Sequence, residues 1–187
     1  MNSKLLQIVF ENRKIGRKHQ NDCNVCVDGV DCRIPQRGPA FASHKFNKKS
    51  ALRYELGTDI QEGDIVWLNG GFPAGRWTDL NIFRFSLKHH LDEGERVEAD
   101  DGYLGEAPGK VKCPRSFVNP PENEEMQRLC RSRHETVNGR MKAWKILAEP
   151  YRHDISTHGE VFRAIAVITQ LAIKNGEPLF HVEYKDP

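Results

Sequence analysis

Short apolar runs bounded by polar and glycine-rich segments dominate the first half of the chain. Residues 25–27, 51–56 and 65–68 are runs of this kind, and their length and their branched and aromatic content predict strands. The segment 61–64, Gln-Glu-Gly-Asp, is short enough for a hairpin connection, so the second and third runs should pair. A fourth strand is expected over residues 96–99.

In the second half, apolar residues recur at three- and four-residue steps, which is the spacing of an amphipathic helix. A helix should begin after Thr78, a good N-cap, and reach about residue 91. A longer helix is expected over 123–147, and another over 161–174 after the capping-box match at 157–160. The core stripe expected on the long helix consists of Met126, Leu129, Cys130, Val137, Met141 and Trp144.

The order of these elements is three strands, a helix, a strand, an irregular stretch over 102–122, two helices and an extended segment near 179–184. This order predicts an α/β fold in which a mixed sheet is flanked by helices. A chain of 187 residues is long enough for one domain that buries about two thirds of its unfolded surface. We therefore expect a basic lead-in segment over 1–22 and one domain over 23–187.

The charge of the chain is unevenly distributed, and this distribution bears on which ligand the protein binds. The formal net charge is only +2, which does not by itself indicate a nucleic-acid-binding protein, but the basic residues are clustered. No run approaches about 18 consecutive apolar residues, so no membrane-spanning helix is expected. The N-terminal segment is too briefly apolar to be a secretory signal.

The five cysteines are an odd number in a chain too long to need disulfides for its stability, which suits a reducing compartment. Cys23 and Cys26 form a C-x-x-C pair, and a zinc-stabilised domain, with Cys32, Cys113 or Cys130 completing the site, is one interpretation. No second closely spaced pair exists, and Cys26 falls in a strand-like run. Buried free thiols are therefore the favoured expectation.

Three carboxylates stand at positions that point to a shared site. Asp28 ends the first apolar run and Asp100 ends the fourth, so the two should converge at one sheet edge if their strands are neighbours. Glu135 is the one acidic residue between residues 128 and 145. Mg²⁺ prefers such oxygen ligands, and two cations about 4 Å apart can neutralise a phosphate, activate water and stabilise the leaving oxygen. Asp28, Asp100 and Glu135 therefore predict a site for Mg²⁺ or Mn²⁺ that acts on phosphodiesters.

The helix around Glu135 carries cations suited to binding phosphate. Six lysines or arginines fall within residues 128–145. Arg131 lies four residues before Glu135, Arg128 seven before and Lys142 seven after, so all three share its helical face. A helix selected only for solubility would more often mix charges of both signs. We expect Arg128, Arg131 and Lys142 to contact the phosphates of a nucleic acid.

Each of the three carboxylates also has an ordinary structural interpretation. Asp28 and Asp100 both stand in good turn sequences, before Gly29 and Gly102, and a helix glutamate beside arginines is usually in a surface ion pair. Asp79 is interpreted as a first-turn helix residue rather than a ligand. The residues that could replace one of the three as ligands are Asp31, Asp101 and His134.

Together these motifs resemble the DDE superfamily endonucleases, in particular transposases of the PIF/Harbinger type. The resemblance extends over nearly the whole chain from about residue 25. The segments that carry it are Val27-Asp28-Gly29, residues 43–47 with 52–55, residues 65–70 with Pro73, Gly75 and Asp79, residues 98–103 around Asp100, and residues 133–142 around Glu135.

The resemblance implies a ribonuclease H-like fold, a divalent-metal site at Asp28, Asp100 and Glu135, and DNA strand cleavage and transfer in the nucleus. We therefore expect the catalytic domain of a metal-dependent DNA endonuclease or transposase, with DNA as its partner and the basic lead-in adding non-specific affinity. A separate DNA-binding protein that recognises the target and a homo-oligomeric state are left open. The alternative is a domesticated transposase-derived module that binds DNA or protein without cleavage.

Overall fold

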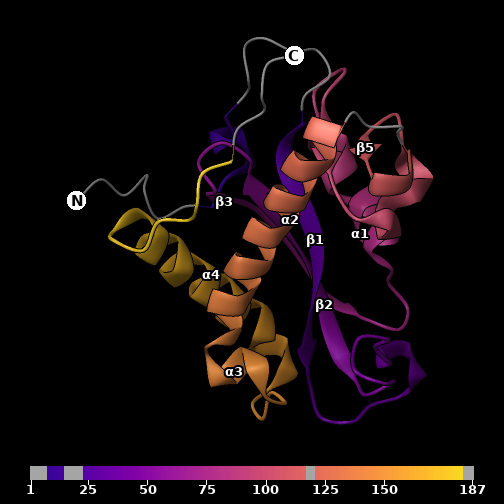
Figure 1. The fold of residues 1–187 in the computed structure, drawn as a ribbon. Helices are drawn as coiled ribbons and strands as arrows, with labels where there is room; N and C mark the ends of the chain where they lie inside the picture. Colours follow the sequence, from indigo (N-terminus) through magenta and orange to yellow (C-terminus); the bar gives the residue numbers. More distant parts are fainter. Residues whose placement is uncertain (1–7, 15–22, 117–120, 183–187) are drawn as a thin grey trace.

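A single mixed sheet organises the molecule in this computed structural model, which describes residues 8–14, 23–116 and 121–182. Its five strands have the order β3-β2-β1-β4-β5, and Figure 1 shows helices packed around them. The strands are β1 (Cys23–Arg33), β2 (Ala51–Asp59), β3 (Ile65–Pro73), β4 (Arg96–Glu98) and β5 (Val111–Lys112). β1, β2 and β3 pair antiparallel, whereas β1 with β4 and β4 with β5 pair parallel. The α/β class with a mixed sheet flanked by helices is therefore confirmed, and the arrangement is consistent with a ribonuclease H-like fold.

Helices cover both faces of this sheet. They are α1 (Asp79–Phe85), α2 (Pro121–Lys142), α3 (Lys145–Ala148) and α4 (His158–Lys174). Because side chains alternate along a strand, β1 contributes Val25 and Val27 to the core that contains Phe83 of α1. Its Val30 joins instead the core that contains Val137 of α2. Two hydrophobic cores thus lie on opposite faces of β1, with α1 on one side and α2 with α4 on the other.

The strands were predicted in the right places, but some extend further than the apolar runs. β1 continues without a break through Gly29, which had been interpreted as a turn position. The hairpin of β2 and β3 is confirmed, with Leu56 opposite Leu68. The stretch expected to be irregular contributes a fifth strand, Val111–Lys112, because β4 offers it a parallel edge.

The helices differ more from the expected ranges. α1 ends at Phe85 because Ser86 leaves helical geometry (φ −135°, ψ −77°), and a 3-10 turn follows. The long helix ends at Lys142, and Trp144, expected in the core, is 47% exposed. The capping box is wrong, because the hydroxyl of Thr157 donates to the carbonyl of Asp154 (2.8 Å) and caps no backbone N–H of α4.

The ends of the chain are described in part. Of the lead-in over 1–22, residues 8–14 are described, and the guanidinium of Arg13 there forms ion pairs with Glu95 (2.7 Å) and Asp92 (2.9 Å). Residues 179–182 form no strand, and the rest of the extended segment predicted there lies outside the described residues. No helix among the described residues is long and apolar enough to cross a membrane.

Candidate functional site

Parallel pairing of β1 with β4 brings Asp28 and Asp100 to matching heights. Cys26 is paired with Glu98, and each aspartate lies two residues further along its own chain. β4 ends at Glu98, so Asp100 stands just beyond the strand, where its carboxylate accepts a hydrogen bond from the backbone N–H of Gly102 (2.8 Å). Asp28 remains inside β1 on the face that α2 covers. The turn interpretation is therefore wrong for Asp28 and correct for Asp100.

The third carboxylate comes from α2, which crosses this face of β1. Val137 and His134 are buried against the sheet, whereas Glu135 is exposed. A hollow of about 100 Å³ lies between the helix, the middle of β1 and the segment that follows β4. Its lining consists of Cys26, Val27, Asp28, Asp100, Arg131, His134 and Glu135. The three carboxylates proposed as metal ligands thus line one hollow, although they come from separate parts of the chain.

His134 lies in the wall of the hollow as an uncharged group. Its Nε2 is 2.9 Å from the carbonyl oxygen of Leu56, and because a carbonyl only accepts, Nε2 carries the hydrogen. Burial lowers the pKa of His134, although the nearby charge of Asp28 acts in the opposite direction. The imidazole is therefore neutral at pH 7, and its unprotonated nitrogen is Nδ1.

Lys45 approaches the site from the loop between β1 and β2. Its ammonium donates a hydrogen bond to the carbonyl of Gly29 (2.6 Å) and lies 3.9 Å from Oδ1 of Asp28. The side chain of Lys45 is 45% exposed and that of Asp28 is 30% exposed. Lys45 had been noted only as part of a motif, since nothing in the spacing of a loop residue indicates that it will fold back onto β1.

The donor set suits a hard divalent cation, because all three residues offer carboxylate oxygens. Within the described residues, Asp100 and Glu135 take part in no ion pair, and Asp28 has Lys45 alone. As the side chains stand, however, the described part of the chain contains no group of three His, Cys, Asp or Glu residues placed to hold a metal ion. Because Asp100 and Glu135 are exposed, their side chains can rotate toward Asp28 when a cation binds.

Of the three alternative ligands, His134 lines the hollow, whereas Asp31 and Asp101 each form an ion pair. Asp31 is buried and forms an ion pair with Arg53 (2.7 Å), so it faces away from the hollow. Asp101 forms an ion pair with Arg115 (3.0 Å). The cysteines are all buried free thiols. For the zinc interpretation, Cys23 and Cys26 are not joined by a third metal-ligating side chain among the described residues.

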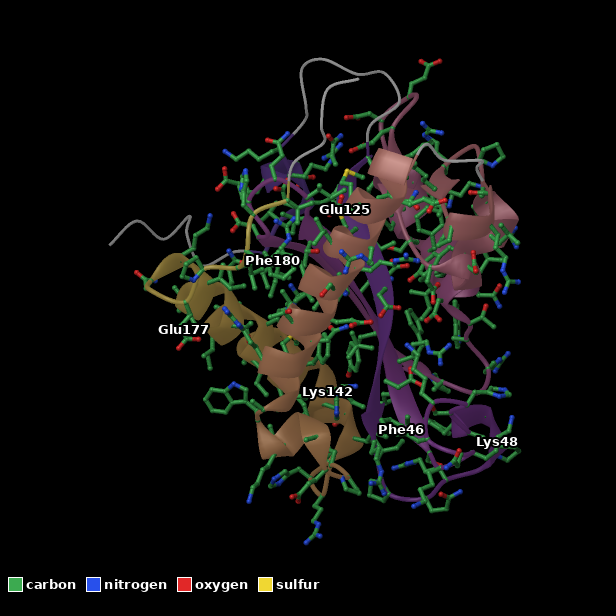
Figure 2. The ribbon with its side chains drawn as sticks, viewed as in Figure 1. Phe46, Lys48, Glu125, Lys142, Glu177 and Phe180 are labelled. Carbon is green, nitrogen blue, oxygen red and sulfur yellow. The ribbon has the colours of Figure 1, made fainter. Side chains whose placement is uncertain are left out.

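The cations of α2 fall into two groups. Arg131 lines the hollow, Arg128 is exposed, and Nζ of Lys142 lies 5.8 Å from the centre of the Phe46 ring. Figure 2 shows Lys142 and Phe46 near the lower end of the helix. Arg133, by contrast, is buried and donates hydrogen bonds to the carbonyls of residues 59 and 60. The basic character of the helix is therefore in part structural.

A second acidic group lies on the opposite face of the sheet, behind Gly29. Glu55 is fully buried, accepts a hydrogen bond from Nε1 of Trp67 (2.9 Å), and has its pKa raised to about 8 by burial. Asp79 is the first residue of α1, as expected, yet burial raises its pKa as well. Sequence reasoning missed Glu55 because a charged residue in an alternating strand normally faces water.

No protein-family model matches the chain, and a search of curated proteins found no match. The fold and the site define the protein as an α/β domain with a small carboxylate-lined hollow beside the end of a parallel strand.

Proposed function

We propose that the protein is a divalent-metal-dependent DNA endonuclease with the catalytic domain of a DDE-type transposase. The observation that carries the proposal is the convergence of Asp28, Asp100 and Glu135 on one hollow. They come from a strand, from the segment after its parallel neighbour and from a helix that packs across that strand. This donor set and the basic residues beside it fit a phosphodiester substrate better than a neutral one.

In this proposal Asp28, Asp100 and Glu135 hold Mg²⁺ or Mn²⁺, which supplies charge neutralisation and an activated water at the phosphate. Arg131 in the lining and Lys45 beside Asp28 are placed to bind phosphate oxygens. DNA is the proposed partner, and a nuclear location follows from the same family resemblance, whereas a homo-oligomeric state stays open.

A binding module without cleavage is the second candidate. It is favoured by the finding that no group of three metal-ligating side chains in the described part of the chain is placed to hold an ion. In that case the carboxylates of the hollow would remain separate in solution, and DNA or a protein would bind to the basic surface alone.

The two candidates are separated by nicking of supercoiled plasmid DNA with Mg²⁺ or Mn²⁺, together with calorimetric titration of Mn²⁺. We expect nicking, and we expect Asp100→Asn to reduce it by at least about a hundredfold, because loss of a metal ligand should exceed the effect of an outer-shell change. The asparagine can still accept from the N–H of Gly102, so the fold is retained. Asp28→Asn and Glu135→Gln should act in the same way.

Asp101→Asn is the matched control, because Asp101 is adjacent in sequence but paired with Arg115. It should nick DNA at the parent rate. Equal nicking by Asp100→Asn and the parent, or no Mn²⁺ binding at millimolar concentration, would overturn the nuclease proposal.

A further inference from the structure

The loop between β1 and β2, residues 34–50, is strongly basic, and we call it the basic loop. No aspartate or glutamate occurs between Asp31 and Glu55. The exposed basic side chains of the loop are Arg37, His44, Lys45, Lys48 and Lys49. In a protein whose net charge is only +2, this is a marked local excess of positive charge.

The charges of the basic loop are not neutralised by the fold. Among the described residues, the contact of Lys45 with Asp28 is its one ion pair. Because an ammonium can only donate, Nζ of Lys48 donates a hydrogen bond to Nε2 of His44 (2.9 Å), and this contact leaves the positive charge of the lysine uncancelled. A cluster of exposed cations with one ion pair attracts polyanions over the range of the Debye length.

The basic loop is held in shape by its own hydrogen bonds. The hydroxyl of Ser43 donates to Asp31, and its carbonyl accepts from the N–H of Lys48 (2.8 Å). Asn47 and Lys48 adopt the left-handed backbone region (φ 51° and 66°), which turns the chain tightly. A ligand therefore meets a surface that is already ordered, and little conformational entropy is lost on binding.

Phe46 connects the basic loop to α2. The guanidinium carbon of Arg33 lies 6.0 Å from the centre of its ring, and Nζ of Lys142 lies 5.8 Å from it. Figure 2 shows Phe46 between Lys142 on α2 and Lys48 on the outer side of the loop. The positive surface thus extends from the loop to the helix that carries Glu135.

We propose that the basic loop and Lys142 bind the sugar–phosphate backbone of duplex DNA and lead it to the hollow. Lys45 forms the inner end of this surface, 3.9 Å from Asp28. The path of the DNA from this surface to the carboxylates rests on the proposed function. It favours DNA as the ligand over an acidic protein or an anionic membrane. The binding itself requires only the charges of the loop.

Binding of a fluorescently labelled duplex, measured by anisotropy in EDTA over a series of salt concentrations, tests the proposal without cleavage. Lys48→Gln/Lys49→Gln should weaken binding about tenfold near 100 mM salt. It should also reduce the slope of log K against log salt by about 2, because each phosphate contact contributes about 0.9. Lys142→Gln, which leaves the loop unchanged, should reduce the slope by about 1.

Arg163→Gln on α4 is the matched control for Lys142→Gln, because it removes one charge from an exposed position that has no ion pair among the described residues. It should leave the slope unchanged. Equal slopes for the loop variants and the parent overturn the proposal, as does tighter binding to phosphatidylserine vesicles or polyglutamate than to DNA at equal salt.

Asp100→Asn separates this proposal from the nuclease proposal. In EDTA it should bind the duplex as the parent does, since no carboxylate of the hollow takes part in backbone binding. If the parent never nicks DNA but the loop variants show a smaller slope of log K against log salt, the loop assignment is supported and the nuclease proposal is wrong. If the parent nicks DNA and the loop variants bind it as the parent does, the loop assignment falls alone.

Discussion

Gly29 and Asp79 are in direct contact, although one lies in β1 and the other begins α1. A Cβ atom at Gly29 would overlap Oδ1 of Asp79 and lie 2.6 Å from its Cγ. Asp79 is also held by Arg53, whose Nη1 lies 3.5 Å from Oδ1. The glycine next to Asp28 is therefore explained by close packing of a helix carboxylate rather than by a turn.

Gly29→Ala should lower the free energy of unfolding by about 1–3 kcal/mol, because the added methyl group must displace a buried carboxylate from its ion pair. Urea denaturation measures this change. Gly139→Ala is the control, since that helical glycine has open space around it. The control should raise the free energy of unfolding by up to about 1 kcal/mol. A Gly29→Ala protein as stable as the parent would show that the packing against Asp79 is loose.

Glu55→Gln should stabilise the protein at alkaline pH. Burial raises the pKa of Glu55 to about 8 in the folded state, above its value near 4.5 in the unfolded chain. The folded state therefore binds the proton more tightly, and stability from this group falls as pH rises from about 4.5 to 8. An amide mimics the protonated carboxyl and can still accept from Trp67, so this loss should disappear.

Melting temperatures between pH 4 and 9 test the effect of Glu55→Gln. The melting temperature of the variant should increase relative to that of the parent as pH rises, whereas Glu149→Gln at an exposed position should show no such trend. A difference in melting temperature between Glu55→Gln and the parent that stays constant across this pH range would contradict a raised pKa of Glu55.

His158→Gln should make the protein less sensitive to acid. The imidazole is buried, its Nδ1 lies 2.6 Å from the hydroxyl of Tyr54, and its pKa is lowered by burial to about 4. The unfolded chain binds the proton near pH 6.5, so stability from this group is present above that pH and is lost as pH falls toward 4. The parent should therefore lose more stability over this window than the variant.

Denaturant midpoints at pH 7, 6, 5 and 4 measure the difference between His158→Gln and the parent. The variant should be less stable at pH 7, because the hydrogen bond with Tyr54 and the ring packing are lost. His89→Gln, at an exposed position, should follow the parent at every pH. Parallel curves for His158→Gln and the parent would show that His158 is not held neutral.

Lys45→Met should strengthen Mn²⁺ binding by up to about fivefold. The ammonium lies 3.9 Å from Asp28 and competes with a metal ion for that carboxylate. A partly exposed ion pair is worth at most about 1 kcal/mol, which sets this limit. Calorimetric titration gives the affinity, and Lys49→Met, farther along the same loop, should leave it within about twofold. Weaker Mn²⁺ binding by Lys45→Met would mean that the lysine supports the site instead of competing for it.

Local patterns account for most of the secondary structure. Apolar runs predicted four of the five strands, and helical periodicity predicted α2 with Met126, Val137 and Met141 in the core. The errors fall where a local signal competes with a distant contact. Thr157 looked like a capping residue, but Tyr151 and Asp154 engage its hydroxyl. The end of α2 at Lys142, before Trp144, depends on how α3 turns away, which no periodicity reveals.

The features of the candidate site also divide into those that a local pattern predicted and those that depend on a distant contact. An acid after each of two apolar runs and one within a basic helix were sufficient to select Asp28, Asp100 and Glu135, which line one hollow. The burial of Arg133, the proximity of Lys45 to Asp28 and the neutral state of His134 were not visible in the same patterns. Each depends on a partner more than fifteen residues away, so neither composition nor spacing encodes it.

Side-chain periodicity and local backbone preference were enough to predict the kind of each main element, the face that each helix buries and the residues available for chemistry. Three features depend instead on the tertiary structure: β1 lies beside β4, α2 packs across β1, and Glu55 is buried inside a strand covered by helices on each face. Register and crossing position result from the packing of distant side chains. The meeting of three acids in one hollow is therefore a property of the fold.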